Sequence, residues 1–549
     1  MYTTTGSFPS KYPLALAAFT ASALVAALLL VSTAIASDSL VPDGVAHRAG
    51  LKVEWNSQMK VGGASKMVDW FLQINENEST TYFTMESGPL REVVSNRQLN
   101  AKGEPYGLGG AKDEIDFRAE ILEARYKKRG VEGYEIKRSN YSLPKSVLYT
   151  LASNGMVSAI DADTGVHYWD RVIASDSRVV GLGASDNKVA VVIGSRVFCL
   201  NAADGRVLWD RQTTYSPGAS PAVSDTHIFV PLANGRLQTY SIEDEGLGSN
   251  SYFASGFSSA RPLVTPTGVA WVTDNGHLNF ANPKTSKAVN FRLKASNAIV
   301  SSPTGKGDMI FVASLDGYVY GIDRVKGSLD WEVTTGSGIS ASPVPIGDFL
   351  FVVSDTKQIY KLDSRTGLYA PGWDTPKEGI AKFLGATRKS VFGLNAFNQL
   401  VVFDQESGRK TSSIPVGDIA LVLTNYESDR IYVASSEGLV QCVRDVSSPR
   451  PIFHSSEFDT SIMEDGKKKP KKNEDDEDPF GDEEDPFDDG SDPFGDDESE
   501  EGSGTKEGSG TKEGSGTKEG SDTKEGSDTK DDNPFGADDE GDDDDNPFN

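Results

Sequence analysis

Two cysteines and five histidines are the side chains in this sequence best suited to redox chemistry or metal binding. Cys199 and Cys442 are too few for a disulfide framework or a four-cysteine zinc site. We therefore expect both to be reduced residues that fill small spaces in the core. The histidines occur singly, without metal-ligand spacing, so we assign no metal site. They are His47, His167, His227, His277 and His454.

Motifs that bind phosphate or supply a nucleophile are also not completed. Gly336-Ser337-Gly338 is followed by Ser342-Pro343 and a further strand, whereas a dinucleotide-binding loop leads into a helix. Gly107–Gly110 lacks the Lys-Ser/Thr of a phosphate-binding loop, and no Gly-x-Ser-x-Gly elbow occurs. No catalytic or cofactor-binding residue is assigned, and no cofactor is predicted.

Three carboxylates that could act as acids or bases have a simpler interpretation. Asp161, Asp163 and Asp323 lie in short segments that end in glycine, and aspartate in such segments caps the backbone of a turn. We therefore interpret all three as turn formers.

The elements that carry these residues repeat along the chain. Eight apolar positions follow one another at spacings of 40 or 41 residues, a period typical of propeller blades. They are Val157, Val197, Leu237, Leu278, Val319, Ile359, Leu400 and Val440.

Each repeat contains four short β-strands. Val147–Ser153, the turn at Asn154-Gly155 and Met156–Asp161 form a predicted hairpin, and a third strand contains Trp169. In four repeats a proline is predicted to precede the remaining strand. These prolines are Pro221, Pro262, Pro303 and Pro343. We predict an all-β fold, an eight-bladed β-propeller over residues 51–454, with seven blades as the alternative.

The last repeat lacks its Trp-containing strand. Leu51–Ser57 contains Trp55 and is predicted to supply it, which would close the ring with the two ends of the chain and remove both free sheet edges. Further β-structure is expected at Met67–Ile74 and Thr80–Glu86, and residues 37–50 are expected to be a linker.

A helical insertion is predicted within about residues 101–140. Ile115, Ala119, Leu122 and Tyr126 recur at helical spacing on one face, and the other face is densely charged. Two roles remain open for this helix on the propeller rim, a simple spacer or a partner-binding element.

Both ends of the chain differ from the repeats. Residues 1–36 are predicted to be a signal peptide, because the apolar run Leu14–Ile35 ends in Ala34-Ile35-Ala36 and cleavage is expected before Ser37. An uncleaved membrane anchor is the alternative, since the run is long enough to span a bilayer. In either case the bulk of the chain is expected to be exported.

Residues 455–549 are predicted to be a disordered, acidic, low-complexity tail. Residues 474–549 carry 32 acidic residues and five lysines, a net charge of −27. The whole chain also has a net charge of −27, so residues 1–473 sum to zero and nucleic acid is not an expected partner. Five Pro-Phe units are interpreted either as docking anchors for a partner protein or as part of a solvating segment. Their aromatic residues are Phe480, Phe487, Phe494, Phe535 and Phe548.

The units Gly155–Trp169, Ser195–Trp209 and Gly317–Trp331 resemble pyrroloquinoline-quinone-type propeller repeats. This resemblance covers about residues 51–450. One branch of the superfamily, the quinoprotein dehydrogenases, implies eight blades, a calcium-bound quinone, a catalytic aspartate and a pair of adjacent cysteines. Cys199 and Cys442 are 243 residues apart, which does not fit that branch.

The other branch is non-catalytic and includes the propeller subunit of the bacterial outer-membrane β-barrel assembly machinery. It implies a protein-binding scaffold of the periplasm or cell envelope. Such relatives carry a lipidated cysteine after the signal peptide, which is missing here. We favour this non-enzymatic reading, with protein partners at a propeller face and membrane contact only if residues 14–35 are retained. The alternative is a PQQ-dependent quinoprotein oxidoreductase.

Overall fold

The computed structural model describes residues 39–454, except residues 63–64, 89, 132, 175–177, 244–247, 286–287 and 449. It divides the chain into two units, Met1–Lys469 and Pro470–Asn549, and all described residues belong to the first. The predicted signal peptide or anchor and the predicted acidic tail lie outside the described residues.

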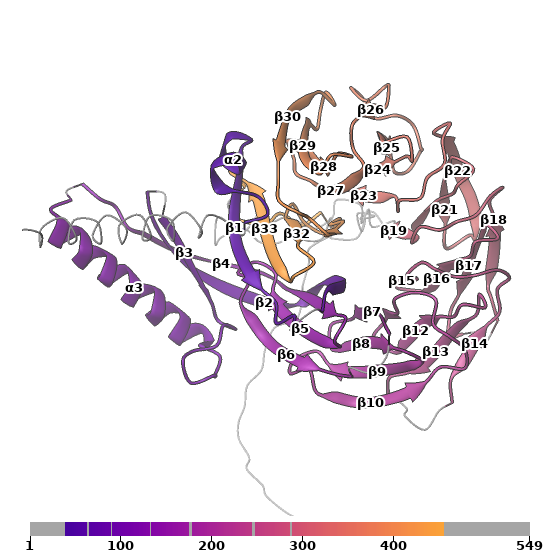
Figure 1. Cartoon of the computed structure of the whole chain (residues 1–549), viewed down its shortest axis with the longest axis horizontal. Helices are drawn as coiled ribbons and strands as arrows, with labels where there is room; N and C mark the ends of the chain where they lie inside the picture. The colour runs from indigo at the N-terminus through magenta and orange to yellow at the C-terminus, as the bar shows by residue number, and fades with distance from the viewer. Residues whose placement is uncertain are drawn as a thin grey trace, which may run out of the picture. The chain divides into compact units, whose positions relative to one another are not determined.

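The described residues form eight antiparallel sheets that follow one another around a ring (Figure 1). The predicted β-propeller is therefore confirmed. The first sheet contains β2 (Met67–Ser87), β3 (Leu90–Ser95), β4 (Lys137–Ala152), β5 (Met156–Asp161) and β6 (His167–Val172). The second contains β7 (Val179–Ala184), β8 (Lys188–Ile193), β9 (Arg196–Asn201) and β10 (Val207–Gln212). The third contains β11 (Ala222–Val223), β12 (His227–Pro231), β13 (Leu237–Ser241) and β14 (Asn250–Tyr252).

The next three sheets have the same plan. The fourth contains β15 (Leu263–Thr265), β16 (Gly268–Val272), β17 (His277–Ala281) and β18 (Phe291–Lys294). The fifth contains β19 (Thr304–Lys306), β20 (Met309–Ala313), β21 (Tyr318–Asp323) and β22 (Ser328–Thr334). The sixth contains β23 (Val344–Ile346), β24 (Phe349–Val353), β25 (Gln358–Asp363) and β26 (Lys377–Glu378).

The last two sheets complete the ring. The seventh contains β27 (Lys382–Ala386), β28 (Ser390–Leu394), β29 (Gln399–Asp404) and β30 (Lys410–Pro415). The eighth contains β31 (Leu421–Leu423), β32 (Ile431–Ala434), β33 (Leu439–Asp445) and β1 (Leu51–Gln58).

Strands at the inner edge of the ring begin where the sequence predicts them. β11, β15, β19 and β23 each start directly after one of the four periodic prolines. Proline has no N–H to donate to a sheet, so it is tolerated at the start of an edge strand and excluded from a central one. The proline period therefore marks the strands that face the central channel.

Tryptophans of the outer strands explain why a small residue stands opposite them in several repeats. Trp169 lies opposite Ala159, Trp209 opposite Cys199, and Trp331 opposite Gly321. At Gly321 a Cβ atom would lie 2.1 Å from Trp331, so the indole leaves no room for a larger side chain. Cys199 forms no disulfide and is fully buried, as predicted, and serves as such a small residue.

The ring closes through the N-terminal strand, as predicted. β1 pairs antiparallel with β33, from Leu51 opposite Asp445 to Gln58 opposite Leu439. Trp55 lies opposite Cys442, which likewise forms no disulfide and is buried, and thus occupies the position that the last repeat lacks. Its Nε1 donates a hydrogen bond to the carbonyl of Ala162 in the first sheet, at 3.1 Å.

Residues 39–50 are packed against the ring, so the predicted linker is wrong for this stretch. It contains helix α2 (Asp43–Arg48), and Leu40, Val41 and Ala46 are buried against apolar residues of the seventh and eighth sheets. The side chain of Gln441 accepts from the amide of Val41 and donates to its carbonyl. These three apolar residues are too few to form a recognisable helix or strand pattern in the sequence. Their burial nevertheless excludes water from the edge of the core.

A projecting arm extends the first sheet (Figure 1). We define it as the outer halves of β2 and β4, Ser79–Ser87 and Lys137–Lys145, together with β3 and helix α3 (Gly107–Arg129). The two strands expected at Met67–Ile74 and Thr80–Glu86 are one strand, β2, with an irregular register between Asn75 and Ser79.

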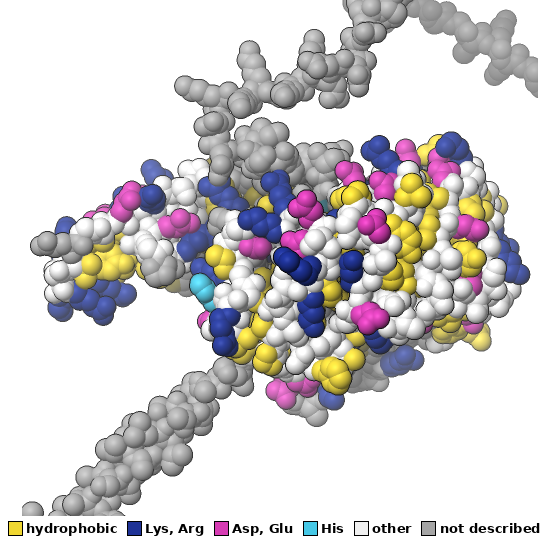
Figure 2. Space-filling model, turned by 90° about the horizontal axis from the view of Figure 1, so that it is seen from above, with side chains coloured by type: hydrophobic (Ala, Val, Ile, Leu, Met, Phe, Trp, Pro, Cys, Tyr) yellow, Lys and Arg dark blue, Asp and Glu magenta, His cyan; other side chains and the backbone are white. Residues whose placement is uncertain are grey.

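Helix α3 is the predicted helical insertion, and the predicted apolar face is the one that packs on the sheet. Its buried residues are Ala111, Ile115, Ala119 and Leu122, which pack with Met85 of β2 and Val94 of β3. The helix ends at Gly130, whose φ of 64° is a left-handed conformation that glycine adopts at little cost. Figure 2 shows basic side chains beside apolar ones at the far end of the arm.

Candidate functional site

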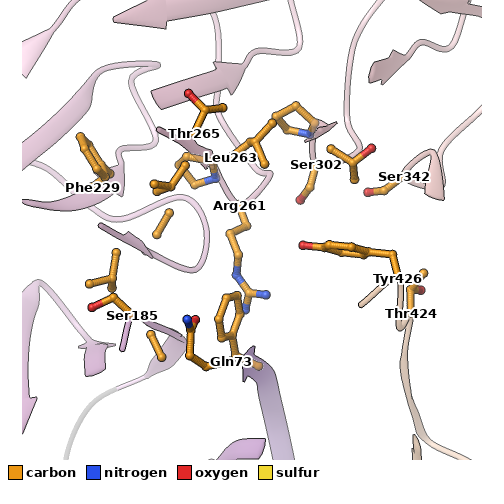
Figure 3. A pocket seen from close by; sticks show the side chains of 18 of the residues that line it. Gln73, Ser185, Phe229, Arg261, Leu263, Thr265, Ser302, Ser342, Thr424 and Tyr426 are labelled. Atoms are coloured by element: carbon orange, nitrogen blue, oxygen red, sulfur yellow. The ribbon is translucent and has the colours of Figure 1, made fainter. Parts of the chain in front are cut away.

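A central cavity of about 920 Å³ is lined by the inner strands of the eight sheets. Figure 3 shows that its wall combines hydroxyl groups, among them Ser302, Ser342 and Thr424, with the apolar side chains of Phe229 and Leu263. Concave sites of this size that mix apolar walls with a few polar groups are typical of binding sites.

An ion pair spans part of the cavity wall. Arg261, the residue before Pro262 at the start of β15, donates from Nη2 to Asp69 Oδ2 of β2 at 2.8 Å and to the carbonyl of Leu182 at 3.0 Å. Asp69 Oδ2 also accepts from Ser220 Oγ at 2.8 Å and from the amide of Leu182 at 2.9 Å. The carboxylate of Asp69 therefore connects the first four sheets. Its Oδ2 atom already accepts three hydrogen bonds from groups of the protein itself.

Sequence reasoning missed Arg261, although a signal was present. The residue before the periodic proline is serine at Ser220, Ser302 and Ser342, and arginine only at position 261. A different residue at one position of an otherwise regular repeat indicates a role that the other repeats lack. Asp69 had no comparable signal, because it lies before the first repeat.

Two other ionisable groups of the cavity wall, Tyr426 and Asp186, are at least partly buried. Tyr426 points toward Arg261 in Figure 3, and burial raises the pKa of its hydroxyl. Burial also raises the pKa of Asp186, although its carboxylate accepts a hydrogen bond from Gln73 Nε2 at 3.0 Å. The cavity therefore presents hydroxyl and amide groups to a ligand, together with the exposed charged residues Asp225, Lys284 and Lys382.

The donor set of this cavity does not fit a calcium-bound quinone. Over the described part of the chain, no three His, Cys, Asp or Glu side chains are grouped so that they could hold a metal ion. Cys199 and Cys442 belong to different core clusters, so they do not form the adjacent pair that the dehydrogenase branch implies. We derive no reaction step through such a group.

A second polar cluster lies where the ring closes. Glu54 of β1 pairs with Arg444 of β33 at 2.5 Å and with Arg91 of the arm at 3.0 Å. Burial opposes ionisation of Glu54, but the two guanidinium groups outweigh it and lower the pKa of this carboxyl group. The pairs link three segments that are distant in sequence.

Asp163 belongs to this second cluster, so its interpretation as a turn former is wrong. In the turn, Asp161 accepts from the amides of Asp163 and Thr164, both at 2.9 Å, whereas the carboxylate of Asp163 accepts from the hydroxyl of Tyr141 at 3.3 Å. Burial raises the pKa of Asp163 to about 6. Asp323 caps its own turn by accepting from the amides of residues 325 and 326, as predicted.

The remaining sequence motifs do not converge on one site. Gly336-Ser337-Gly338 lies in the loop between β22 and β23, which leads into a strand. His167 contacts Asp170 through Nδ1 and Ser57 through Nε2, at 3.0 and 3.1 Å. No helix within the described segments is long and apolar enough to cross a membrane.

Comparison with protein families finds a match over the repeats. Residues 153–375 and 247–450 match the family described as outer membrane protein assembly factor BamB. The two ranges together extend from residue 153 to residue 450, more than half of the chain. The arm, β1 and α2 lie before this range.

Two curated relatives carry the same description. The chain is 31% identical over 101 residues to the protein from Yersinia pestis, and 23% identical over 199 residues to that from Bordetella pertussis. These stretches cover 16% and 33% of this chain, and only 26% and 51% of the two relatives.

Two solved structures are also similar. BamB from Moraxella catarrhalis has a TM-score of 0.45 at 17% identity, over 54% of this chain and 91% of that one. The computationally designed Ika8 protein has a TM-score of 0.44 at 15% identity, over 54% of this chain and 92% of that one.

Proposed function

The chain belongs to the family described as outer membrane protein assembly factor BamB, and on this premise we propose that it is a non-catalytic scaffold that binds other proteins. We place it outside the cytoplasm, in the periplasm or cell envelope, where it would assist outer-membrane protein assembly. The observation that carries this proposal is the family match over residues 153–450, which contain all but the first part of the ring.

The cavity chemistry supports a binding role. Asp69 is held by a guanidinium, a hydroxyl and backbone amides, so it is not poised as a free base. In the first sheet β2 pairs with both β3 and β4, but the channel-facing strands of the other seven sheets each stand at the end of the sheet and pair on one side only. Their free edges and the hydroxyl groups beside them offer hydrogen bonds to an extended polypeptide.

A deletion strain tests this proposal. Loss of the chain should lower the amount of β-barrel proteins in the outer membrane, and the full chain supplied from a plasmid should restore it. A photo-crosslinking residue in place of Thr424, which lines the cavity, should capture a component of barrel assembly. The same residue in place of Phe397, which is 84% exposed and lies outside the cavity, serves as the matched control.

The quinoprotein alternative makes the opposite prediction. Purified chain supplied with pyrroloquinoline quinone and calcium should not reduce an electron-accepting dye with alcohol or sugar substrates. Dye reduction that requires both additions, together with unchanged outer-membrane protein levels in the deletion strain, would overturn the scaffold proposal.

A further inference from the structure

Helix α3 has a second apolar strip on the face that points away from the sheet. Phe117 is 58% exposed and Ile121 is 37% exposed. Their separation of four residues places them side by side on the helix surface, opposite the buried Ile115 and Ala119. Neighbouring exposed apolar side chains bordered by polar ones are typical of an interaction surface.

Basic residues continue this strip to the end of the arm. Arg125, Lys127, Lys128 and Arg129 are exposed, and none of them forms an ion pair among the described residues. Two acidic groups of the helix, Asp116 and Glu123, pair with Arg138 instead, whereas Glu120 is exposed near the strip. Residues 125–138 carry six basic and two acidic residues, a net charge of +4 within a folded part that sums to zero.

We define the arm tip as residues 117–138, where this charge and the apolar strip meet. Val131, just beyond the helix, is 43% exposed. The ring centroids of Tyr126 and Tyr134, which flank it in the sequence, lie 4.7 Å apart. Figure 2 shows this end of the arm as a projection on which basic and apolar side chains are neighbours.

We propose that the arm tip binds an anionic lipid surface. Long Lys and Arg side chains place their charges among phosphate headgroups while their aliphatic stems and the neighbouring Phe117 and Ile121 enter the apolar boundary. A convex projection with cations on long side chains suits a flat membrane surface better than it suits an acidic peptide, which needs a groove.

Vesicle co-sedimentation of the full chain tests this inference. Phosphatidylcholine vesicles that contain phosphatidylglycerol should bind the chain more tightly than phosphatidylcholine vesicles. The difference should shrink as salt is raised, because screening weakens the attraction. Any insertion by residues 14–35 would be common to both vesicle types and cancels in the difference.

Charge reversal at Arg125, Lys127, Lys128 and Arg129 to Glu should lower the affinity for the anionic vesicles by at least about tenfold. The control reverses Lys294, Lys357, Lys389 and Lys410, exposed on the ring, which changes the net charge equally and should leave binding unchanged. Phe117→Ser with Ile121→Ser should weaken binding several-fold, whereas Leu368→Ser with Phe397→Ser on the ring should not.

Two results would overturn the proposal. One is equal loss of vesicle binding in both charge-reversed variants, which would mean that net charge alone acts. The other is binding of soluble polyglutamate that depends on the four arm-tip cations while the two vesicle types bind alike, which would assign the arm tip to acidic proteins. Neither result bears on partner capture at the cavity, so the proposed function is tested separately.

Discussion

Arg261 replaces the serine of three other repeats and thereby ties four sheets to one carboxylate. The sequence predicted none of the polar residues that converge on the cavity, because Asp69 and Arg261 are 192 residues apart and meet only through the ring. It did predict the positions of the inner strands that hold them. At this scale the regular repeat positions were predictable, and the exception at Arg261 was visible in the sequence, but its partner Asp69 was not.

A double-mutant cycle measures what the cavity ion pair contributes. Arg261→Ser and Asp69→Asn should each destabilise the fold, and the double variant should lose less than their sum, with a coupling of about 1–2 kcal/mol. Denaturant unfolding gives the four free energies. The exposed pair Lys137–Glu135 is the control and should show almost no coupling. A coupling near zero for Arg261 and Asp69 would contradict the structural role given to this pair.

Asp163 should make stability depend on pH. Its pKa is raised from 3.8 to about 6 by burial, so the folded protein keeps this proton after the unfolded chain has lost it. Protonated Asp163 is therefore compatible with folding. As pH rises from about 4 through about 6, ionisation of Asp163 increasingly lowers the free energy of unfolding.

The variant Asp163→Asn isolates this effect. Its stability relative to the natural chain should rise between pH 4 and pH 7, by up to about 3 kcal/mol, and level off above the folded pKa. Unfolding at several pH values is the measurement. Asp323→Asn is the control that should show a nearly constant difference over this range, because hydrogen bonds from Lys326 lower the pKa of Asp323 below 3.8 and its titration then lies at more acidic pH. A constant difference for Asp163→Asn across this range would refute the assignment.

The elements of the ring follow from repeated local chemistry. Proline starts the inner strand, and a small residue faces each outer tryptophan, so both signals recur with the period of the fold. The arm was harder to predict, because the polar residues between Asn75 and Ser79 interrupt the strand pattern while the backbone continues through an irregular register. Helix α2 was not predicted, because its six residues are too few to show a helical pattern of apolar residues.

Trp55 tests the element that closes the ring. Its indole N–H binds the carbonyl of Ala162, whereas the indole N–H of Trp209 has no hydrogen-bond partner among the described residues. Trp55→Phe should therefore cost about 1–2 kcal/mol more than Trp209→Phe, since the two changes remove similar apolar surface. Thermal and denaturant unfolding of both variants is the measurement. Equal losses would show that the hydrogen bond does not help to fix β1.

At the scale of the whole molecule, the acidic segment should not contribute to the stability of the ring. Residues 474–549 hold the entire net charge of −27 and few apolar residues, so they have little means of burying surface. Deleting them should shift the thermal midpoint by no more than about 1–2 °C, a free-energy change below about 0.5 kcal/mol. Calorimetry of the truncated and full chains decides this, and a large drop would contradict the division of the chain.

Pairing of β1 with β33 also determines the order in which this protein can fold. Leu51 and Asp445 are nearly 400 residues apart, so the first strand to emerge during synthesis waits for the last one. Bringing such distant segments together costs loop-closure entropy that the growing chain cannot recover earlier. Until then β1 and the β33 edge of the eighth sheet stay unpaired, a hazard for aggregation. Completion of the ring is therefore the step that removes this hazard.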